Sequence, residues 1–128
     1  MLIKYSNDNR KVAMGFLSYI SDLKELSNLE REIDLFENDD TRQLYLWKSE
    51  FADYAGVVAI SIESNCIYIE YFSLNPSFRS QSNEFLIYDE LKAIYPDKIV
   101  LGNRKLVNSI RDWEKQKLLI DNEEVETD

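Results

Sequence analysis

One stretch of the sequence decides the fold: Ile69-Glu70-Tyr71-Phe72-Ser73-Leu74-Asn75-Pro76-Ser77-Phe78-Arg79-Ser80-Gln81-Ser82-Asn83-Glu84. Its first part is rich in β-branched and aromatic residues, which is typical of a strand, and Pro76 prevents that strand from continuing. A polar segment and then an apolar stripe with helical spacing predict a loop followed by a helix. The first N–H groups of a helix have no partners within it, and the helix dipole favours negative charge there. The stretch therefore predicts a strand, a loop and a helix, with an anion docking where the helix begins.

Further strands are predicted before this unit. Residues 43–47, 54–62 and 66–74 are three runs rich in Val, Ile and aromatic residues. The polar links between them, 48–53 and 63–65, have the length of hairpin connections, so we expect an antiparallel meander. Nearer the N-terminus, residues 2–5 predict a short strand, and two segments with helical spacing predict two helices that end near Asn38. The second helix is expected to bury Leu23, Leu26, Leu29, Ile33 and Phe36.

The rest of the chain completes a mixed sheet. The helix after the central loop ends at Pro96, and residues 99–101 predict a short buried strand closed by Gly102. A last helix places Leu106, Ile110 and Trp113 on one face. The order β-α-α-β-β-β-α-β-α describes an α/β (α+β) fold whose final strand pairs in parallel. Residues 1–120 are interpreted as a single domain and the acidic residues 121–128 as an unstructured tail.

Composition and charge exclude several classes of protein. A chain of 128 residues, 45% hydrophobic with three glycines, is expected to bury one core. The net charge of −9 disfavours nucleic acid as a partner, and no uncharged stretch is long enough to span a membrane. The absence of histidine excludes histidine-based triads, and no acids recur at metal-ligand spacing. The single cysteine, Cys66, fits a reducing cytoplasmic location and is expected to be an ordinary buried side chain.

The central stretch resembles the motif of the GNAT superfamily of N-acetyltransferases, apolar-x-Pro-x-x-Arg/Gln-x-x-Gly-x-Gly/Ala at the end of the fourth strand. Leu74, Pro76 and Arg79 match that motif in place, and the predicted element order fits the GNAT fold. The resemblance implies acetyl-CoA as co-substrate, with backbone groups near Phe72 and Leu74 holding its pantetheine arm. It also implies that the next loop grips the pyrophosphate, so the other candidate cofactor-binding residues are Arg79, Ser80, Gln81, Ser82, Asn83 and Glu84.

Within this superfamily the chain is similar to the small RibT-type proteins, which are encoded with enzymes of riboflavin biosynthesis. The similar blocks are residues 1–5, 13–18, 43–48 and 74–79. This similarity supports family membership more strongly than it supports any activity.

The pyrophosphate loop departs from the motif at its glycines, where this chain has Ser82-Asn83-Glu84. Glycine permits close approach of the backbone to a phosphate, so the side chains of Ser82 and Glu84 intrude. A carboxylate held about 6 Å from a phosphate charge would weaken binding roughly 100-fold at an effective dielectric near 20. Alternatively, Glu84 complements the helix dipole and Ser82 is the N-cap, an arrangement that also disfavours tight CoA binding.

Few side chains offer chemistry for acetyl transfer, which needs a deprotonated amine, donors for an oxyanion and a proton for the leaving thiolate. Glu70 is the candidate catalytic base, because strand alternation places it on the same face as Phe72 and Leu74. Glu63, in the preceding turn, is a weaker second candidate. The resemblance implies a tyrosine acid just before Glu-Lys on the last helix, but Trp113 stands there, and it is expected to be a core residue.

Three functions are open. In the first, favoured by the family resemblance, the chain moves an acetyl group from acetyl-CoA to an amine of a small molecule or a protein, and its acidic body suits a cationic acceptor. In the second, it is a catalytically inactive GNAT-fold binding or regulatory module associated with riboflavin metabolism. In the third, it is an unrelated α/β domain, whose fourth and fifth strands would not splay apart. Exposed sheet edges favour a homodimer.

Overall fold

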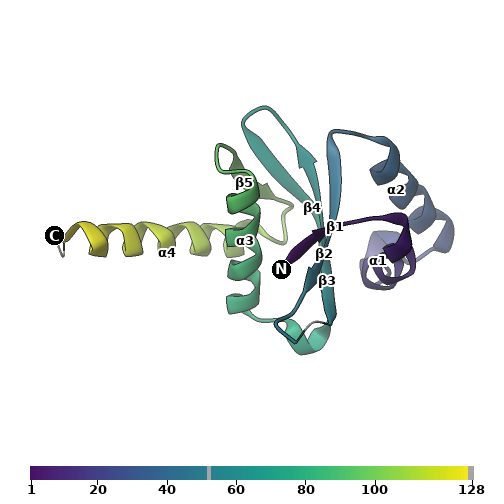
Figure 1. Ribbon diagram of the computed structural model, residues 1–128, viewed down its shortest axis with the longest axis horizontal. Helices are drawn as coiled ribbons and strands as arrows, with labels where there is room; N and C mark the ends of the chain where they lie inside the picture. Colours follow the sequence, from purple (N-terminus) through teal and green to yellow (C-terminus); the bar gives the residue numbers. More distant parts are fainter. Residues whose placement is uncertain (52, 127–128) are drawn as a thin grey trace.

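The computed structural model describes residues 1–51 and 53–126 and confirms the predicted order of elements (Figure 1). The strands are β1 (Leu2–Lys4), β2 (Arg42–Lys48), β3 (Tyr54–Ile62), β4 (Cys66–Leu74) and β5 (Ile99–Gly102). The helices are α1 (Arg10–Leu17), α2 (Leu26–Asn38), α3 (Gln81–Ile94) and α4 (Val107–Glu126). Single 3₁₀ turns occur at η1 (Asn7–Asn9), η2 (Ser21–Leu23) and η3 (Pro76–Phe78).

The strands form a mixed sheet in the order β1-β2-β3-β4-β5. β1 to β4 pair antiparallel, which confirms the predicted meander, and β3 and β4 have the predicted bounds. β5 pairs with β4 in parallel, and α3 makes the crossover between them. This order places β4, which carries the central motif, between β3 and the last strand.

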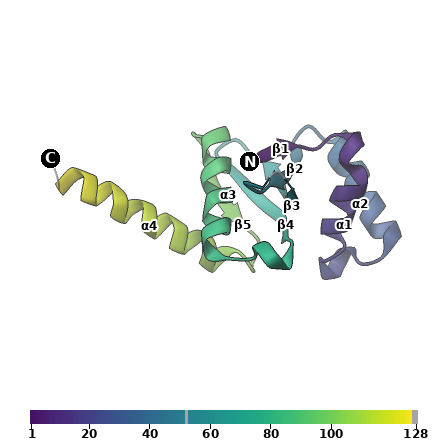
Figure 2. The ribbon, with the colours of Figure 1, turned by 60° about the horizontal axis from the view of Figure 1, so that its bottom comes forward.

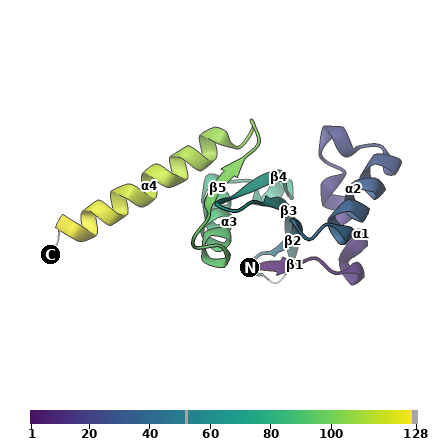
Figure 3. The same ribbon diagram turned by 90° about the horizontal axis from the view of Figure 1, so that it is seen from above.

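The sheet lies between two layers of helices (Figures 1 and 3). α1 and α2 cover one face, and α3 with the first turns of α4 covers the other. The α1/α2 cluster is the apolar core on the first face, and it includes Ala13, Leu17, Leu29, Ile33, Leu46, Val57 and Ala59. The α3/α4 cluster is the core on the second face, and it includes Val58, Ile60, Ile67, Ile69, Ile87, Leu91 and Trp113.

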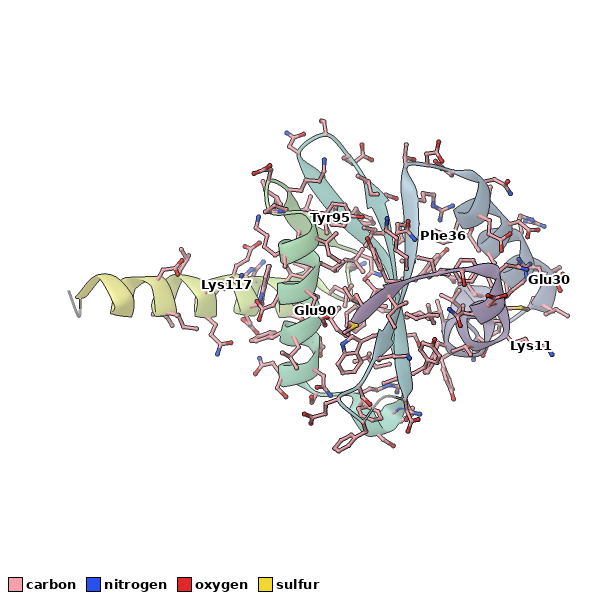
Figure 4. All side chains as sticks on the ribbon, in the orientation of Figure 1. Lys11, Glu30, Phe36, Glu90, Tyr95 and Lys117 are labelled. Atoms are coloured by element: carbon pink, nitrogen blue, oxygen red, sulfur yellow. The ribbon has the colours of Figure 1, made fainter. Side chains whose placement is uncertain are left out.

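Polar contacts fix α3 across the N-terminal edge of the sheet. Figure 4 shows Glu90 on α3 beside the start of the chain, whereas Phe36 of α2 lies on the other side of the sheet. Glu90 Oε1 accepts a hydrogen bond of 2.9 Å from the Leu2 N–H, and its Oε2 accepts one of 3.2 Å from the Trp47 indole. A half-buried carboxylate with two donors thus connects α3 to β1 and β2.

Two predictions of burial are wrong. Leu26 is 62% exposed because it is the first residue of α2 and lies beyond the buried stripe of that helix. In β5 only Val100 is buried, whereas Ile99 and Leu101 are exposed. β5 is the edge strand of the sheet, and helices α3 and α4 pack on one of its faces. A short apolar run at a sheet edge is therefore buried at alternate residues.

The last helix is longer than the sequence predicts. α4 continues to Glu126, whereas an unstructured tail was expected from residue 121, and residues 127 and 128 lie outside the described part. Residues 121–126 contain neither glycine nor proline and include helix-forming glutamates, so nothing in their sequence ends the helix. The second half of α4 runs away from the body of the molecule (Figure 2). In the described residues, no helix combines the length and the apolar character needed to cross a bilayer.

Candidate functional site

β4 and β5 part halfway along β4. Their parallel pairing ends at Ile69 opposite Gly102, and residues 71–74 continue in register with β3 alone. A cavity of about 550 Å³ opens beside this free edge. The remaining walls come from residues 19–22, from Arg79 and Glu84, and from residues 103–105. β4 and β5 therefore splay apart, which an unrelated α/β domain was not expected to show.

A β-bulge lies where the two strands part. Ile60 of β3 pairs with Ile69, and the next residue, Ala59, pairs with Tyr71, so Glu70 has no partner across the strands. The extra residue changes which side chains share a face. Ile69 and Phe72 both contact the α3/α4 cluster, whereas Tyr71 packs against the α1/α2 cluster.

The bulge overturns one prediction about Glu70. The carboxylate lies on the α1/α2 face, with Arg42 and Ser61, and not on the face of Phe72 and Leu74. Strict alternation along the strand predicted a common face for these three β4 residues, and it fails because the bulge inserts a residue between Ile69 and Tyr71.

Both carboxylate oxygens of Glu70 accept hydrogen bonds at the cavity wall. Oε2 accepts two from the Arg42 guanidinium, at 2.6 Å from Nη2 and 3.1 Å from Nε, and Oε1 accepts one of 2.6 Å from Ser61 Oγ. Arg42 also binds Glu32 of α2 at 3.0 Å, and its guanidinium stacks 4.0 Å from the centre of the Phe36 ring. These contacts fix the position of the Glu70 carboxylate, and any proton that it accepts must compete with them.

Asn103 closes the point at which the strands separate. Its N–H donates to the Ile69 carbonyl at 3.2 Å, and its side-chain Nδ2 donates to the Glu70 carbonyl at 3.0 Å. Its Oδ1 accepts a hydrogen bond of 3.0 Å from the Lys105 N–H. Sequence analysis missed this residue, although an asparagine directly after Gly102 is a typical turn signal.

The N-cap of α3 is Ser80, so the prediction of Ser82 is wrong. Ser80 has extended backbone angles, and its Oγ accepts a hydrogen bond of 3.1 Å from the Asn83 N–H. Ser82 lies one residue inside the helix, where its helical backbone angles exclude it from the cap position. Among the described residues, no hydrogen bond engages the N–H groups of Gln81 and Ser82, which remain available to an anion.

Glu84 turns its carboxylate across to α4. Oε2 accepts a hydrogen bond of 2.7 Å from Ser109 Oγ, and the Tyr88 hydroxyl donates to the same Ser109 oxygen at 3.0 Å. Glu84 is half-buried, lines the cavity and lies in the first turn of α3, as predicted. Burial raises the pKa of Tyr88 to about 12. The negative charge of Glu84 is thus held between the first turns of two helices, where both dipoles favour it.

The charged residues that line the cavity come from two sets of elements. We name as the α3/α4 end the part lined by Arg79, Arg104 and Lys105 together with Glu84. Arg79 also donates from Nε to the Leu74 carbonyl at 3.0 Å, which ties the end of β4 to the loop. This end therefore presents three cationic side chains and one carboxylate.

The opposite part, the α1/α2 end, is lined by Glu70, Tyr71, Ser73 and residues 19–22. Residues 19–22 connect α1 to α2 and contribute the carboxylate of Asp22. Burial raises the pKa of Tyr71 to about 12, and the nearby charges of Glu32 and Glu70 add to this effect. Sequence analysis missed residues 19–22 and Ser73, because only the fold brings the α1–α2 connection to β4.

The structure brings together part of the predicted site. Glu70, Phe72, Leu74, Arg79 and Glu84 line the cavity, whereas residues 80–83 do not. Outside it lie Glu63, the weaker candidate base, and two residues that were expected to have no catalytic role. Glu63 is in the exposed β3–β4 turn, and Cys66 is half-buried at the start of β4. Trp113 is 4% exposed and donates from its indole to Asp89 at 2.9 Å, so its prediction as a core residue is confirmed.

Comparison with known proteins agrees with this geometry, although no protein-family model matches the chain. A curated relative from Bacillus methanolicus, named as an uncharacterized N-acetyltransferase in the lysA 3' region, is 34% identical over 115 residues. The alignment covers 89% of this chain and 95% of the relative.

Solved structures share the fold. The apo aminoglycoside 6'-N-acetyltransferase AAC(6')-IG of Acinetobacter haemolyticus superposes with a TM-score of 0.67 at 12% identity. AAC(6')-Iy, solved in complex with the bisubstrate analogue CoA-S-monomethyl-acetylneamine, superposes with a TM-score of 0.66 at 12% identity. Each comparison covers 92% of this chain and 88% of the other.

Proposed function

The chain belongs to the GNAT-type N-acetyltransferases, and from this premise we propose that it transfers an acetyl group from acetyl-CoA to an amine of a small molecule. The observation that carries the proposal is the cavity beside the unpaired half of β4. The backbone of Phe72 and Leu74 borders this cavity, so it can offer hydrogen bonds to the pantetheine arm and to the thioester carbonyl. The solved complex of AAC(6')-Iy with a CoA-linked aminoglycoside analogue supports a small-molecule acceptor.

The reaction needs two proton transfers. The amine nitrogen attacks the thioester carbon, the new C–N bond forms as the C–S bond breaks, and the CoA thiolate leaves and takes up a proton. We assign Glu70 as the base that deprotonates the incoming ammonium group. Glu70 takes this proton directly or through a water, in competition with its hydrogen bonds to Arg42 and Ser61. Trp113 has no acidic proton, so the thiolate takes its proton from the attacking nitrogen or from water.

The donor phosphates belong at the α3/α4 end. The N–H groups of Gln81 and Ser82 lie at the start of α3, and Arg79, Arg104 and Lys105 supply positive charge. Glu84 opposes binding there, by roughly 3 kcal/mol at about 6 Å from a phosphate charge and an effective dielectric near 20. The positive charges of Arg79, Arg104 and Lys105 offset part of this repulsion, so we expect acetyl-CoA to bind weakly.

Calorimetric titration with acetyl-CoA tests the proposal. We expect the wild type to bind weakly and Glu84→Gln to bind about 100-fold more tightly, because the substitution removes a repulsion of roughly 3 kcal/mol. Glu30→Gln is the matched control, since Glu30 is an exposed acid on α2, on the far side of the sheet (Figure 4). The double variant Ser82→Gly/Glu84→Gly restores the glycines of the motif. If neither the wild type nor this variant binds at millimolar ligand, acetyl-CoA is not the donor.

A second candidate function is a catalytically inactive GNAT-fold module that binds or regulates, associated with riboflavin metabolism. The carboxylate of Glu84 in the first turn of α3 and the hydrogen-bonded indole of Trp113 favour it. The same titration separates the two candidates. Binding by the glycine variant but not by the wild type supports the inactive module.

A second copy of the chain is the proposed partner of α4. The projecting half of this helix exposes Leu118, Leu119 and Ile120. The helix carries both bases and acids, Asp112 and Glu114 among them, so contact between two copies of α4 rests on these apolar side chains. Sedimentation velocity on the full chain and on Leu119→Asp tests this homodimer, and a monomeric wild type contradicts it.

A further inference from the structure

A chain of three hydrogen-bonded side chains connects the core to the cavity. Glu84 lines the cavity, and its Oε2 accepts a hydrogen bond of 2.7 Å from Ser109 Oγ of α4. The Tyr88 hydroxyl donates to the same Ser109 oxygen at 3.0 Å, and Tyr88 is fully buried beside Phe72 and Trp113. Because a carboxylate can only accept, the Ser109 proton points at Glu84 and the Tyr88 proton points at Ser109. The hydrogen bonds therefore run in one direction, from the core to Glu84.

The carboxylate of Glu84 does not cap its own helix. Glu84 lies in the first turn of α3, where an acid commonly complements the free N–H groups of that helix. Here the Ser80 hydroxyl accepts the hydrogen bond from the Asn83 N–H, and within the described residues the Glu84 carboxylate bonds to the Ser109 hydroxyl alone. Helix α4, and not α3, thus determines where this negative charge lies.

A fixed charge affects a ligand more strongly than a mobile one. An exposed glutamate can turn into solvent, where water and salt screen it. Glu84 is half-buried, and two successive hydrogen bonds tie it to the core, so its charge stays at the cavity wall. A phosphate that approaches the start of α3, or Arg79 beside it, meets this charge in the first turn of the same helix. A ligand without phosphates is not repelled.

We propose that Ser109 is a positioning residue that holds Glu84 as a charge filter against phosphates, so that the chain recognises its acetyl donor by the pantetheine arm and gains little affinity from the phosphates. The inference rests on the proposed function, because it takes an acetyl thioester as the donor. The pantetheine arm is uncharged, so Glu84 does not oppose it. Ser109 is not among the described residues that line the cavity, so it acts through Glu84.

Calorimetric titration with two donors tests this inference. The probes are acetyl-CoA and S-acetylpantetheine, which has the same arm and no phosphate. The wild type should bind the two donors with affinities that agree within about tenfold. Ser109→Ala lets the Glu84 side chain turn into solvent, so acetyl-CoA should bind about tenfold more tightly and S-acetylpantetheine as before. The thermal midpoint should fall, because Tyr88 loses its acceptor. A merely structural role would lower the midpoint with no gain in affinity.

Two further variants isolate the role of the Ser109 hydroxyl. Ser109→Thr is the matched control, because it keeps the hydroxyl, and it should bind both donors as the wild type does. The double variant Glu84→Gln/Ser109→Ala completes a double-mutant cycle. Once the charge is removed, the loss of the Ser109 hydroxyl should change acetyl-CoA affinity by less than about twofold.

Failure of this inference differs from failure of the proposed function. The inference is overturned if Ser109→Ala binds acetyl-CoA no more tightly than the wild type, or if its gain in affinity persists in the Glu84→Gln background. It is also overturned if the wild type binds acetyl-CoA more than about tenfold more tightly than S-acetylpantetheine. If neither donor binds to the wild type or to Glu84→Gln, the proposed function fails, and the inference fails with it.

Discussion

The two halves of β4 differ in what holds them. Residues 67–69 are paired on both edges, with β3 and with β5, and Ile67 and Ile69 are fully buried. Residues 71–74 are in register with β3 alone, Glu70 is the unpaired residue of the bulge, and residues 70–74 line the cavity. One strand thus stabilises the fold with its first half and presents the site with its second half.

The difference extends to the side chains. In the paired half, the side chains suit a strand. Its β-branched residues lie on the core face, and its backbone is paired with β5. The open half contains a bulge at Glu70 and an unsatisfied hydroxyl at Ser73. Local rules of stability are broken in proteins mainly where a function requires it. Loss of the unsatisfied Ser73 hydroxyl should therefore cost little stability, whereas truncation of a core side chain in the paired half should cost much.

The largest expected effect is on the paired half. Ile69→Ala removes a fully buried side chain from the α3/α4 cluster and leaves a cavity, so we expect a loss of about 2 to 5 kcal/mol in the free energy of unfolding. Urea denaturation followed by circular dichroism measures it. Ile99→Ala is the matched control, since Ile99 is 56% exposed, and its cost should stay below about 1 kcal/mol. If Ile69→Ala and Ser73→Ala lowered the free energy of unfolding equally, the two halves of β4 would not differ in their contribution to stability.

A smaller effect is expected at the junction of the two halves. Asn103→Ala leaves the Glu70 carbonyl and the Lys105 N–H without their side-chain partners, at a cost of about 1 to 2 kcal/mol. The separation between the strands would widen, so acetyl-CoA affinity should change as well as stability. Asn65→Ala, in the exposed β3–β4 turn, is the control for both measurements. A variant of Asn103 with unchanged stability would show that the strands part without this residue.

Much of the fold could be predicted from the sequence because its signals are local. The bounds of β3 and β4 follow from runs of β-branched and aromatic residues, and Pro76 marks the end of β4. The match of Leu74, Pro76 and Arg79 to the GNAT motif indicated a segment next to the cavity, which Arg79 and Glu84 both line.

The features that could not be predicted from the sequence depend mainly on contacts between distant segments. The bulge at Glu70 arises from the register of β4 against β3, which no single strand encodes, and it moved the candidate base to the other face. The contribution of residues 19–22 requires the α1–α2 connection to reach β4, and neither segment signals this locally. Ser80 and Ser82 are both suitable caps by composition, and only the backbone angles identify Ser80.

The smallest expected effect concerns the core behind the open half. Tyr88 of α3 packs against the Phe72 ring, with 6.0 Å between ring centres, and burial raises its pKa to about 12 from an ordinary value of 10.0. Between these two pH values the folded state keeps a proton that the unfolded state has lost. The stability contributed by the protonated phenol is therefore complete below pH 10 and falls as the pH rises toward 12.

Stability measured by urea denaturation from pH 8 to pH 10.5 should decline, and Tyr88 should account for less than about 1 kcal/mol of the decline at pH 10.5. Tyr88→Phe should flatten the profile by that amount, although its stability at pH 8 falls slightly because the hydrogen bond to Ser109 is lost. Tyr68→Phe is the control, since Tyr68 lies on the paired half of β4 and is 38% exposed, and its profile should match the wild type. If Tyr88→Phe leaves the profile unchanged, water reaches Tyr88 through the open half, and the core is not closed behind the cavity.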